Sequence, residues 1–123
     1  MVRIRLSDAA QADVVDILVW TQEQFGAAAR TRYESLIVAG LRDVAAQPDR
    51  PGSIERPELG AGVRSWHLRL SRDHASTSTS AGAVRRPRHF LIYRVEPELL
   101  VVGRVLHDAM ELAQHLDPEA SWK

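Results

Sequence analysis

Two apolar segments near the end of the chain constrain its fold more than any other feature of the sequence. Residues 89–95 (HFLIYRV) and 99–107 (LLVVGRVLH) are rich in β-branched and aromatic side chains, and only the tripeptide EPE separates them. Two such runs joined by a few turn-forming residues are typical of a β-hairpin. Because residues 90–93 are all apolar, neither face of the first strand is polar. The hairpin therefore needs a cover supplied by other parts of the chain.

The first half of the chain predicts a short strand followed by a helix. Residues 2–7 alternate between apolar and polar side chains, and Ser7 is a favourable N-cap for a helix over residues 8–25. Gly26 supplies a stop signal. The expected core stripe of this helix consists of Val14, Ile17, Leu18, Thr21 and Phe25.

A second helix is expected over residues 27–46, where apolar positions recur with helical spacing until a proline ends the pattern. So short a connection between two helices predicts an antiparallel helical hairpin. Gly40 lies within the apolar stripe and indicates a close approach of the two helices. The polar residues 47–62, rich in proline and glycine, are expected to form a loop.

The segment between this loop and the closing hairpin predicts a strand and then an insertion. Residues 63–70 alternate, which favours a half-buried strand with Trp66 and Leu68 inward and His67 facing solvent. Residues 71–88 break the pattern and contain the low-complexity tract STSTSAGA. They are interpreted as a flexible loop inserted between two adjacent strands.

This order of elements predicts an α+β fold with an N-terminal strand, an antiparallel two-helix hairpin and a small, mainly antiparallel sheet, in two layers. A single domain is expected over residues 1–123, with a short helix near residues 108–116. The hydrophobic fraction of 45% is typical of a globular protein, and the absence of cysteine excludes disulfides and thiolate zinc sites. Without an apolar run of membrane-spanning length or a signal peptide, the expectation is a cytoplasmic protein with no membrane partner.

The chain has 16 basic and 16 acidic residues, so its net charge is zero. This balance argues against a dedicated nucleic-acid binder. All basic residues except Lys123 are arginines. Either a GC-rich genome or a need for bidentate pairing with carboxylates explains this bias. Near the middle loop the arginines gather, which suggests an acidic partner; these are Arg69, Arg72, Arg85, Arg86 and Arg88.

Several local patterns occur in an order that resembles a known family. They are AAQADVVDILVWTQEQFG, AAQPDRPGS, GVRSWHL, FLIYRV and VVGRVLHDAM, and the resemblance spans roughly residues 3–112. The set is similar to the ParE-type toxins of bacterial toxin–antitoxin modules, within the RelE/ParE superfamily. The resemblance implies a toxin that poisons DNA gyrase without catalysis and that a ParD-like antitoxin holds inactive. The insertion at residues 71–88 departs from the family, where a tight turn is usual.

Candidate binding residues follow from the resemblance and from the apolar positions outside the core stripe. For the antitoxin, whose helix and tail would lie along the helical hairpin and sheet, we expect contacts from Val15, Val19, Trp20, Phe25, Tyr33 and Arg69. For the target and for toxicity, we expect Arg94, Arg104 and His107. Each has a structural alternative, because the arginines could pair with carboxylates on neighbouring strands and His107 could close a strand end.

Two other functions remain open. RelE-type relatives cut messenger RNA on the ribosome, which needs an acid, a base and a cation, and the candidates are His67, His89, His107, Arg64, Arg94 and Arg104. Alternation along the strands scatters these side chains over different faces, so a ribonuclease is the runner-up. The third possibility is a non-toxic member that only binds its antitoxin.

No cofactor, metal ion or directly bound nucleic acid is expected. His107, Asp108 and Glu111 would offer metal ligands, but their spacing carries no established metal-site signature. No phosphate loop or dinucleotide fingerprint occurs in the sequence.

Overall fold

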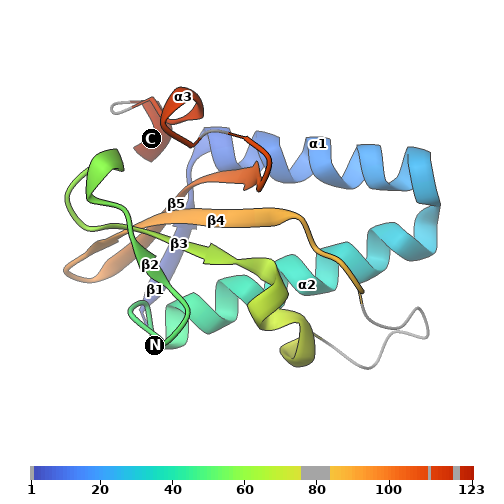
Figure 1. Ribbon diagram of the computed structural model, residues 1–123, viewed down its shortest axis with the longest axis horizontal. Helices are drawn as coiled ribbons and strands as arrows, with labels where there is room; N and C mark the ends of the chain where they lie inside the picture. Colours follow the sequence, from blue (N-terminus) through green and yellow to red (C-terminus); the bar gives the residue numbers. More distant parts are fainter. Residues whose placement is uncertain (1, 76–83, 111, 118–119) are drawn as a thin grey trace.

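Strands and helices form an α+β fold in the expected order (Figure 1). The computed structural model describes residues 2–75, 84–110, 112–117 and 120–123. Five strands make one sheet in the order β1-β5-β4-β3-β2, where β1 runs parallel to β5 and all other neighbours are antiparallel. The predicted fold class is confirmed. The elements are β1 (Arg3–Leu6), α1 (Asp8–Phe25), α2 (Ala27–Ala46), β2 (Ile54–Glu55), β3 (Val63–His67), β4 (His89–Glu96), β5 (Leu99–His107) and α3 (Leu112–His115).

The two long helices begin and end where local signals predict. The side-chain oxygen of Ser7 accepts a hydrogen bond from the Ala10 amide (3.0 Å) and so caps α1. Gly26, with φ of +93°, makes the turn into α2, a conformation that a side chain would strain. Nowhere in the described part of the chain is there a helix long and apolar enough to cross a membrane.

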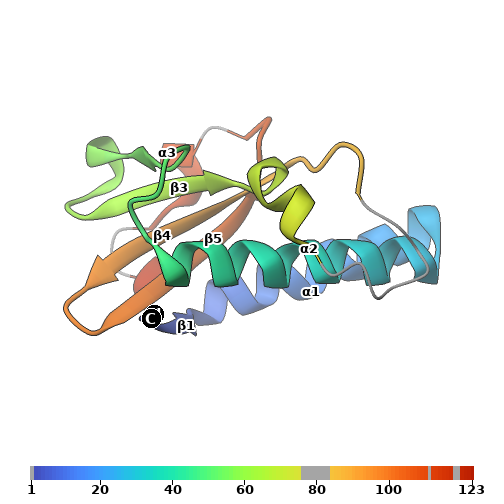
Figure 2. The ribbon, with the colours of Figure 1, turned by 90° about the horizontal axis from the view of Figure 1, so that it is seen from below.

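Both helices pack on one face of the sheet, and the ends where they join project beyond it (Figure 2). Leu18, Leu36 and Val44 are buried there against the sheet residues Leu91 and Val102. The projecting ends lack such a cover. Phe25, placed in the core stripe by helical spacing, is therefore 67% exposed, and that expectation was wrong.

Gly40 marks a close approach, but not that of the two helices. A Cβ atom at this position would lie 2.6 Å from Leu68 Cδ2 and 3.3 Å from Leu91 Cδ1. Its neighbours are thus the segment after β3 and the central strand. Gly40 lets α2 lie close to the sheet side of the core.

The opposite face of the sheet is covered by the end of the chain. Trp122 and Leu116 are buried there against a second apolar cluster formed by Val63, Ile92, Val101 and Leu106. Trp122 sits over Gly103, where a Cβ atom would come within 2.6 Å of the indole ring. The protein therefore has a partial third layer beyond the two layers expected from sequence.

A β-bulge between β4 and β5 changes which side chains share a face. Ile92 pairs with Arg104 but Tyr93 pairs with Val102, so Gly103 is the extra residue on β5. Before the bulge Val102 faces the helices, and after it Val105 does. Alternation that is counted without the bulge therefore assigns the end of β5 to the wrong face.

The strand expected over residues 63–70 ends earlier, at His67. The His67 side chain accepts a hydrogen bond from the Arg69 amide (3.0 Å) and starts a 3₁₀ helix, η2 (Leu68–His74). Ser71 is fully buried within it, so the expected loop over residues 71–88 does not begin there. The middle of that loop, residues 76–83, lies outside the described residues.

Candidate functional site

A groove of about 1190 Å³ lies where the projecting helix ends face the segment that leads into β4. One side comes from α1 and α2, and the other from residues 84–88. Its lining is mainly apolar and includes Ile17, Trp20, Phe25, Ala29, Val84 and Met110. The groove exists because the helical hairpin is longer than the sheet that it covers.

Exposed aromatic side chains form the helical side of this groove. Trp20 is 54% exposed, and its ring meets that of Phe25 edge to face with centroids 5.7 Å apart. Tyr33 of α2 lines the groove beside them. Three of the residues expected to contact the antitoxin, Trp20, Phe25 and Tyr33, therefore lie together in the groove. The structure places Val15 and Val19, both exposed, outside the groove lining, and Arg69 lies outside it on η2.

Residues 84–88 carry arginines along the opposite side, and we call this segment the arginine wall. Arg85, Arg86 and Arg88 line the groove together with Arg32, whereas the acidic lining residue is Asp16. The groove thus combines a mainly apolar lining with positive charge concentrated on the arginine wall.

The arginine wall is fastened to the body at three points. Arg72 Nη1 donates to the Arg85 carbonyl (2.8 Å), and the Arg88 amide donates to the Tyr33 hydroxyl (3.2 Å). The Asp108 amide donates to the Arg88 carbonyl (2.7 Å). The wall is therefore held through η2, α2 and the end of β5.

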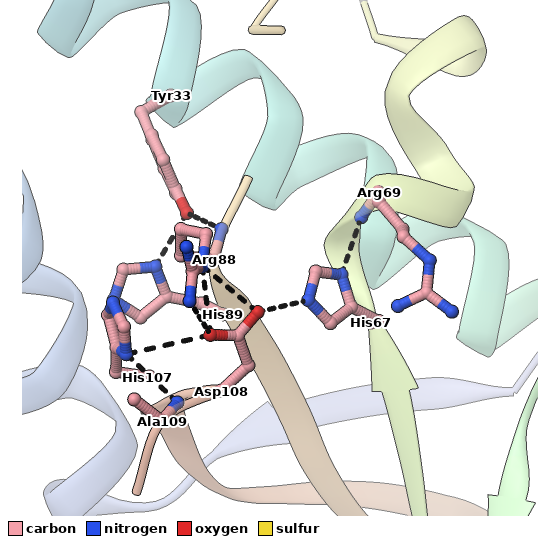
Figure 3. Close-up of polar contacts among 8 residues, drawn as sticks. All are labelled: Tyr33, His67, Arg69, Arg88, His89, His107, Asp108 and Ala109. Carbon is pink, nitrogen blue, oxygen red and sulfur yellow. Dashed lines mark hydrogen bonds and ion pairs between the residues drawn. The ribbon is translucent and has the colours of Figure 1, made fainter. Parts of the chain in front are cut away.

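Three histidines and Asp108 meet at the end of the sheet next to this wall (Figure 3). His67 Nε2 lies 3.0 Å from Asp108 Oδ2, and Arg88 Nη2 lies 2.9 Å from Asp108 Oδ1. His107 Nδ1 is 3.7 Å from the same carboxylate, and the His107 ring packs edge to face on His89. The expectation that the histidines are scattered was wrong: the bulge at Gly103 turns His107 to the helix side, opposite His89, and Asp108 connects this pair with His67 on the other face.

His67 was also misassigned, since its side chain is only 5% exposed. It faces away from the helices as alternation predicts, but Asp108 and Phe90 cover it there. Because His67 Nδ1 accepts from the Arg69 amide, the proton lies on Nε2, which donates to Asp108. Both ring nitrogens are therefore occupied.

Burial shifts the pKa values of the Tyr33–His89 pair in opposite directions. Burial raises the pKa of Tyr33 to about 12. Burial, together with the nearby charge of His107, lowers the pKa of His89 to about 4. At neutral pH His89 is therefore uncharged, and its Nδ1 accepts a hydrogen bond from the Tyr33 hydroxyl at 2.5 Å.

Asp108 stays ionised for a different reason. Its partial burial opposes ionisation, but hydrogen bonds from His67 and Arg88 outweigh this effect and hold the pKa of Asp108 below its ordinary value. The carboxylate is thus a fixed negative charge between cationic or hydrogen-bonding neighbours.

The lowered pKa of His89 predicts a loss of stability in mild acid. The unfolded chain binds a proton at His89 near pH 6.5, whereas the folded protein does so only near pH 4, so the free energy of unfolding falls as the pH drops through that window. Between pH 7 and pH 4.5 this residue is expected to account for about 2 kcal/mol. Urea unfolding of wild type and His89→Gln at both pH values measures it. Equal losses in the two proteins would contradict the prediction.

The three residues expected to contact the target do not form one patch. Arg104 Nε and Nη2 donate to the two carboxylate oxygens of Asp13 on α1 (2.7 and 2.9 Å). Arg94 pairs with Glu96 on its own strand (2.8 Å) and stacks over Trp122 at 4.8 Å. Both arginines have the structural ion pairs considered from sequence, although neither partner lies on a neighbouring strand. His107 alone of the three lines the groove.

Within the described part of the chain, no three histidine or acidic side chains are placed to hold a metal ion. Glu111, which the sequence offered as a third ligand beside His107 and Asp108, lies outside the described residues.

Comparison with known proteins assigns the family. A family model described as the ParE toxin of the type II toxin–antitoxin system, parDE, matches residues 4–112. The chain belongs to this family. It is therefore the toxin component of a type II toxin–antitoxin system, and the family implies an antitoxin partner. A search of the curated proteins found no match. The buried residues Leu116 and Trp122 lie beyond the matched range.

Sequence reasoning missed the role of Asp108 in this toxin, although a signal for it exists. His89 pairs with His107 at the open end of the hairpin, so the residues just outside the pair, Arg88 and Asp108, must be close. An arginine and an aspartate at such flanking positions predict an ion pair. The signal can be used only when the register between β4 and β5 is known, and the bulge shifts that register.

Proposed function

We propose that a ParD-like antitoxin neutralises this toxin by placing an amphipathic, acidic helix in the groove, and that the toxin inhibits DNA gyrase by binding. The observation that carries the first part is the combination of exposed aromatic side chains with the arginine wall in one groove. Exposed apolar surface of this extent in one place is typical of an interaction site. Val15, Val19 and Arg69 would extend the contact beyond the groove.

The size and chemistry of the groove suit a helix better than a small molecule. Its volume of about 1190 Å³ exceeds the ~300–1,000 Å³ typical of small-molecule sites. Helix-in-groove recognition uses apolar anchors at helical spacing, and Trp20 and Phe25 offer aromatic surface for them. Arg85 and Arg86 would pair with carboxylates on the polar side of the bound helix.

The state of the histidines supports action by binding. A general base works best with a pKa near the operating pH, whereas the pKa of His89 is about 4. His67 uses both ring nitrogens, and His107 Nδ1 accepts a hydrogen bond from the Ala109 amide (3.0 Å). These side chains hold the end of the sheet together. Gyrase as the target is the expectation that the ParE family brings, with Arg94, Arg104 and His107 as proposed contacts.

One observation favours a second candidate, a ribosome-dependent ribonuclease. His107 and His89 line the same groove as Arg85, Arg86 and Arg88, so a possible acid and several phosphate-binding cations do lie together. Aromatic side chains on the other side could stack on bases. Of the residues considered from sequence for this chemistry, His89 and His107 lie in the groove, whereas His67, Arg64, Arg94 and Arg104 do not line it.

Co-expression followed by two assays tests these proposals. When it is co-expressed with the gene beside its own, which is expected to encode the antitoxin, the toxin should co-purify as a complex. Expressed alone, the toxin should arrest growth. The freed toxin should then abolish supercoiling by purified gyrase while leaving ribosome-bound messenger RNA intact. Cleaved message with unaffected gyrase would establish the ribonuclease instead. Growth without arrest would indicate a non-toxic, antitoxin-binding member.

A further inference from the structure

The carboxylate of Asp108 lies behind the arginine wall and not in the groove itself. We propose that Asp108 is the positioning residue of the wall, which keeps the groove ready for its partner. This inference rests on the proposed antitoxin groove, but it concerns a residue outside the groove lining and makes a claim that the toxin alone can test.

Asp108 joins three parts of the chain that are distant in sequence (Figure 3). Its Oδ1 accepts from Arg88 Nε and lies 2.9 Å from Arg88 Nη2, so the guanidinium is held by two nitrogens. Its Oδ2 accepts from His67 Nε2 (3.0 Å) at the end of β3. Its backbone amide holds the Arg88 carbonyl. Asp108, at the end of β5, thus holds both the side chain and the main chain of Arg88.

His67 makes Asp108 rigid in turn. The buried imidazole is fixed by the Arg69 amide on one side and by the Phe90 ring on the other, with ring centroids 4.8 Å apart. A carboxylate that bonds to a fixed donor has few alternative positions, so it defines where the Arg88 guanidinium sits. A binding side chain keeps the geometry that its partner needs when hydrogen bonds from neighbouring residues fix its position.

The rest of the wall depends on this anchor. Arg85 and Arg86 are exposed and contribute side chains to the groove, and the main-chain hydrogen bond at their end of the segment is the one from Arg72 to the Arg85 carbonyl. If the Arg88 side chain is released, the segment keeps only its main-chain hydrogen bonds, to Arg72 at Arg85 and to Tyr33 and the Asp108 amide at Arg88, and the guanidinium no longer has a fixed position. Each arginine then has to be ordered when the partner binds, which weakens binding.

Asp108→Asn tests this role because it removes the charge and keeps the shape of the side chain. In the toxin freed from its antitoxin, trypsin is expected to cut after Arg85 about tenfold faster than in wild type. In wild type the hydrogen bond from Arg88 Nε to Asp108 should slow the exchange of the Nε–H proton with water, and in the variant its NMR signal should lose that protection. Affinity for the antitoxin purified from the two-gene system should fall about tenfold.

Two further variants keep the test decisive. Arg88→Gln breaks the same ion pair but leaves the bond between Asp108 and His67, and it should accelerate cleavage after Arg85 to a similar extent. Val63→Ala lowers stability through the buried cluster on the far face of the sheet, away from the groove, and should change neither the Arg88 signal nor the affinity. Wild-type rates of cleavage in both Asp108→Asn and Arg88→Gln would overturn the proposal. If the wild-type toxin does not bind the antitoxin, the proposed function fails, while cleavage and NMR still decide the role of Asp108.

Discussion

Trp122→Ala is expected to lower the free energy of unfolding by about 3–5 kcal/mol, the range typical of a buried tryptophan. Trp122 is only 7% exposed, its ring lies against Gly103, and Arg94 stacks over it at 4.8 Å. Its loss would leave Ile92 and Val101 open to solvent on the far face of the sheet. Urea unfolding followed by circular dichroism measures the effect.

Neighbouring changes in the same tail show whether packing is the cause. Trp122→Phe keeps an aromatic ring over Gly103 and should cost clearly less than the alanine variant. The adjacent, exposed Lys123 should tolerate alanine with a change within about 0.5 kcal/mol. A loss below about 1 kcal/mol for Trp122→Ala would mean that the tail is not part of the core. The result matters because this residue lies beyond the region that the family model matches.

Trp20→Ala is expected to weaken antitoxin binding by at least about 2 kcal/mol, or roughly 30-fold in Kd, with little effect on folding. Large aromatic side chains near the centre of an interface dominate its energy. Trp20 is 54% exposed in the free toxin and contacts Phe25, so its truncation leaves the core untouched. Isothermal titration of the freed toxin with the antitoxin gives the affinity.

The matched control is an exposed apolar residue away from the groove. Ile54 on β2 is 51% exposed and does not line the groove, so Ile54→Ala should bind the antitoxin as wild type does. Thermal unfolding of both variants should lie close to that of wild type. Unchanged affinity in Trp20→Ala would show that the antitoxin does not use the groove, even if it binds elsewhere on the helices.

The helices and strands were largely predictable because their signals are local. Ser7 and Gly26 set the limits of α1, and the bounds of α2 follow from helical spacing and a proline. The closing hairpin was readable from β-branched runs around a three-residue turn. The early end of β3 was not, because His67 stops it through a side-chain contact with the Arg69 amide that alternation does not reveal.

The candidate site was only partly predictable. Trp20 was readable because it is a large aromatic residue outside the core stripe, and the family resemblance pointed to Phe25 and Tyr33. All three line the groove. Arg94 and Arg104 were singled out for their position within apolar strands, but each is held by a carboxylate. The helix partner of Arg104, Asp13, lies 91 residues away in sequence, so no local pattern links them.

The sequence by itself determined the order and limits of most elements, the helical hairpin and the membership of a toxin family, since capping, periodicity and motif order are properties of nearby residues. Tertiary structure alone decided that Gly103 is a bulge, that the histidines meet at Asp108 and that the tail covers the far face of the sheet. The physical reason is register. One extra residue in β5 reverses the facing of all that follow, and only the packed sheet shows where it lies.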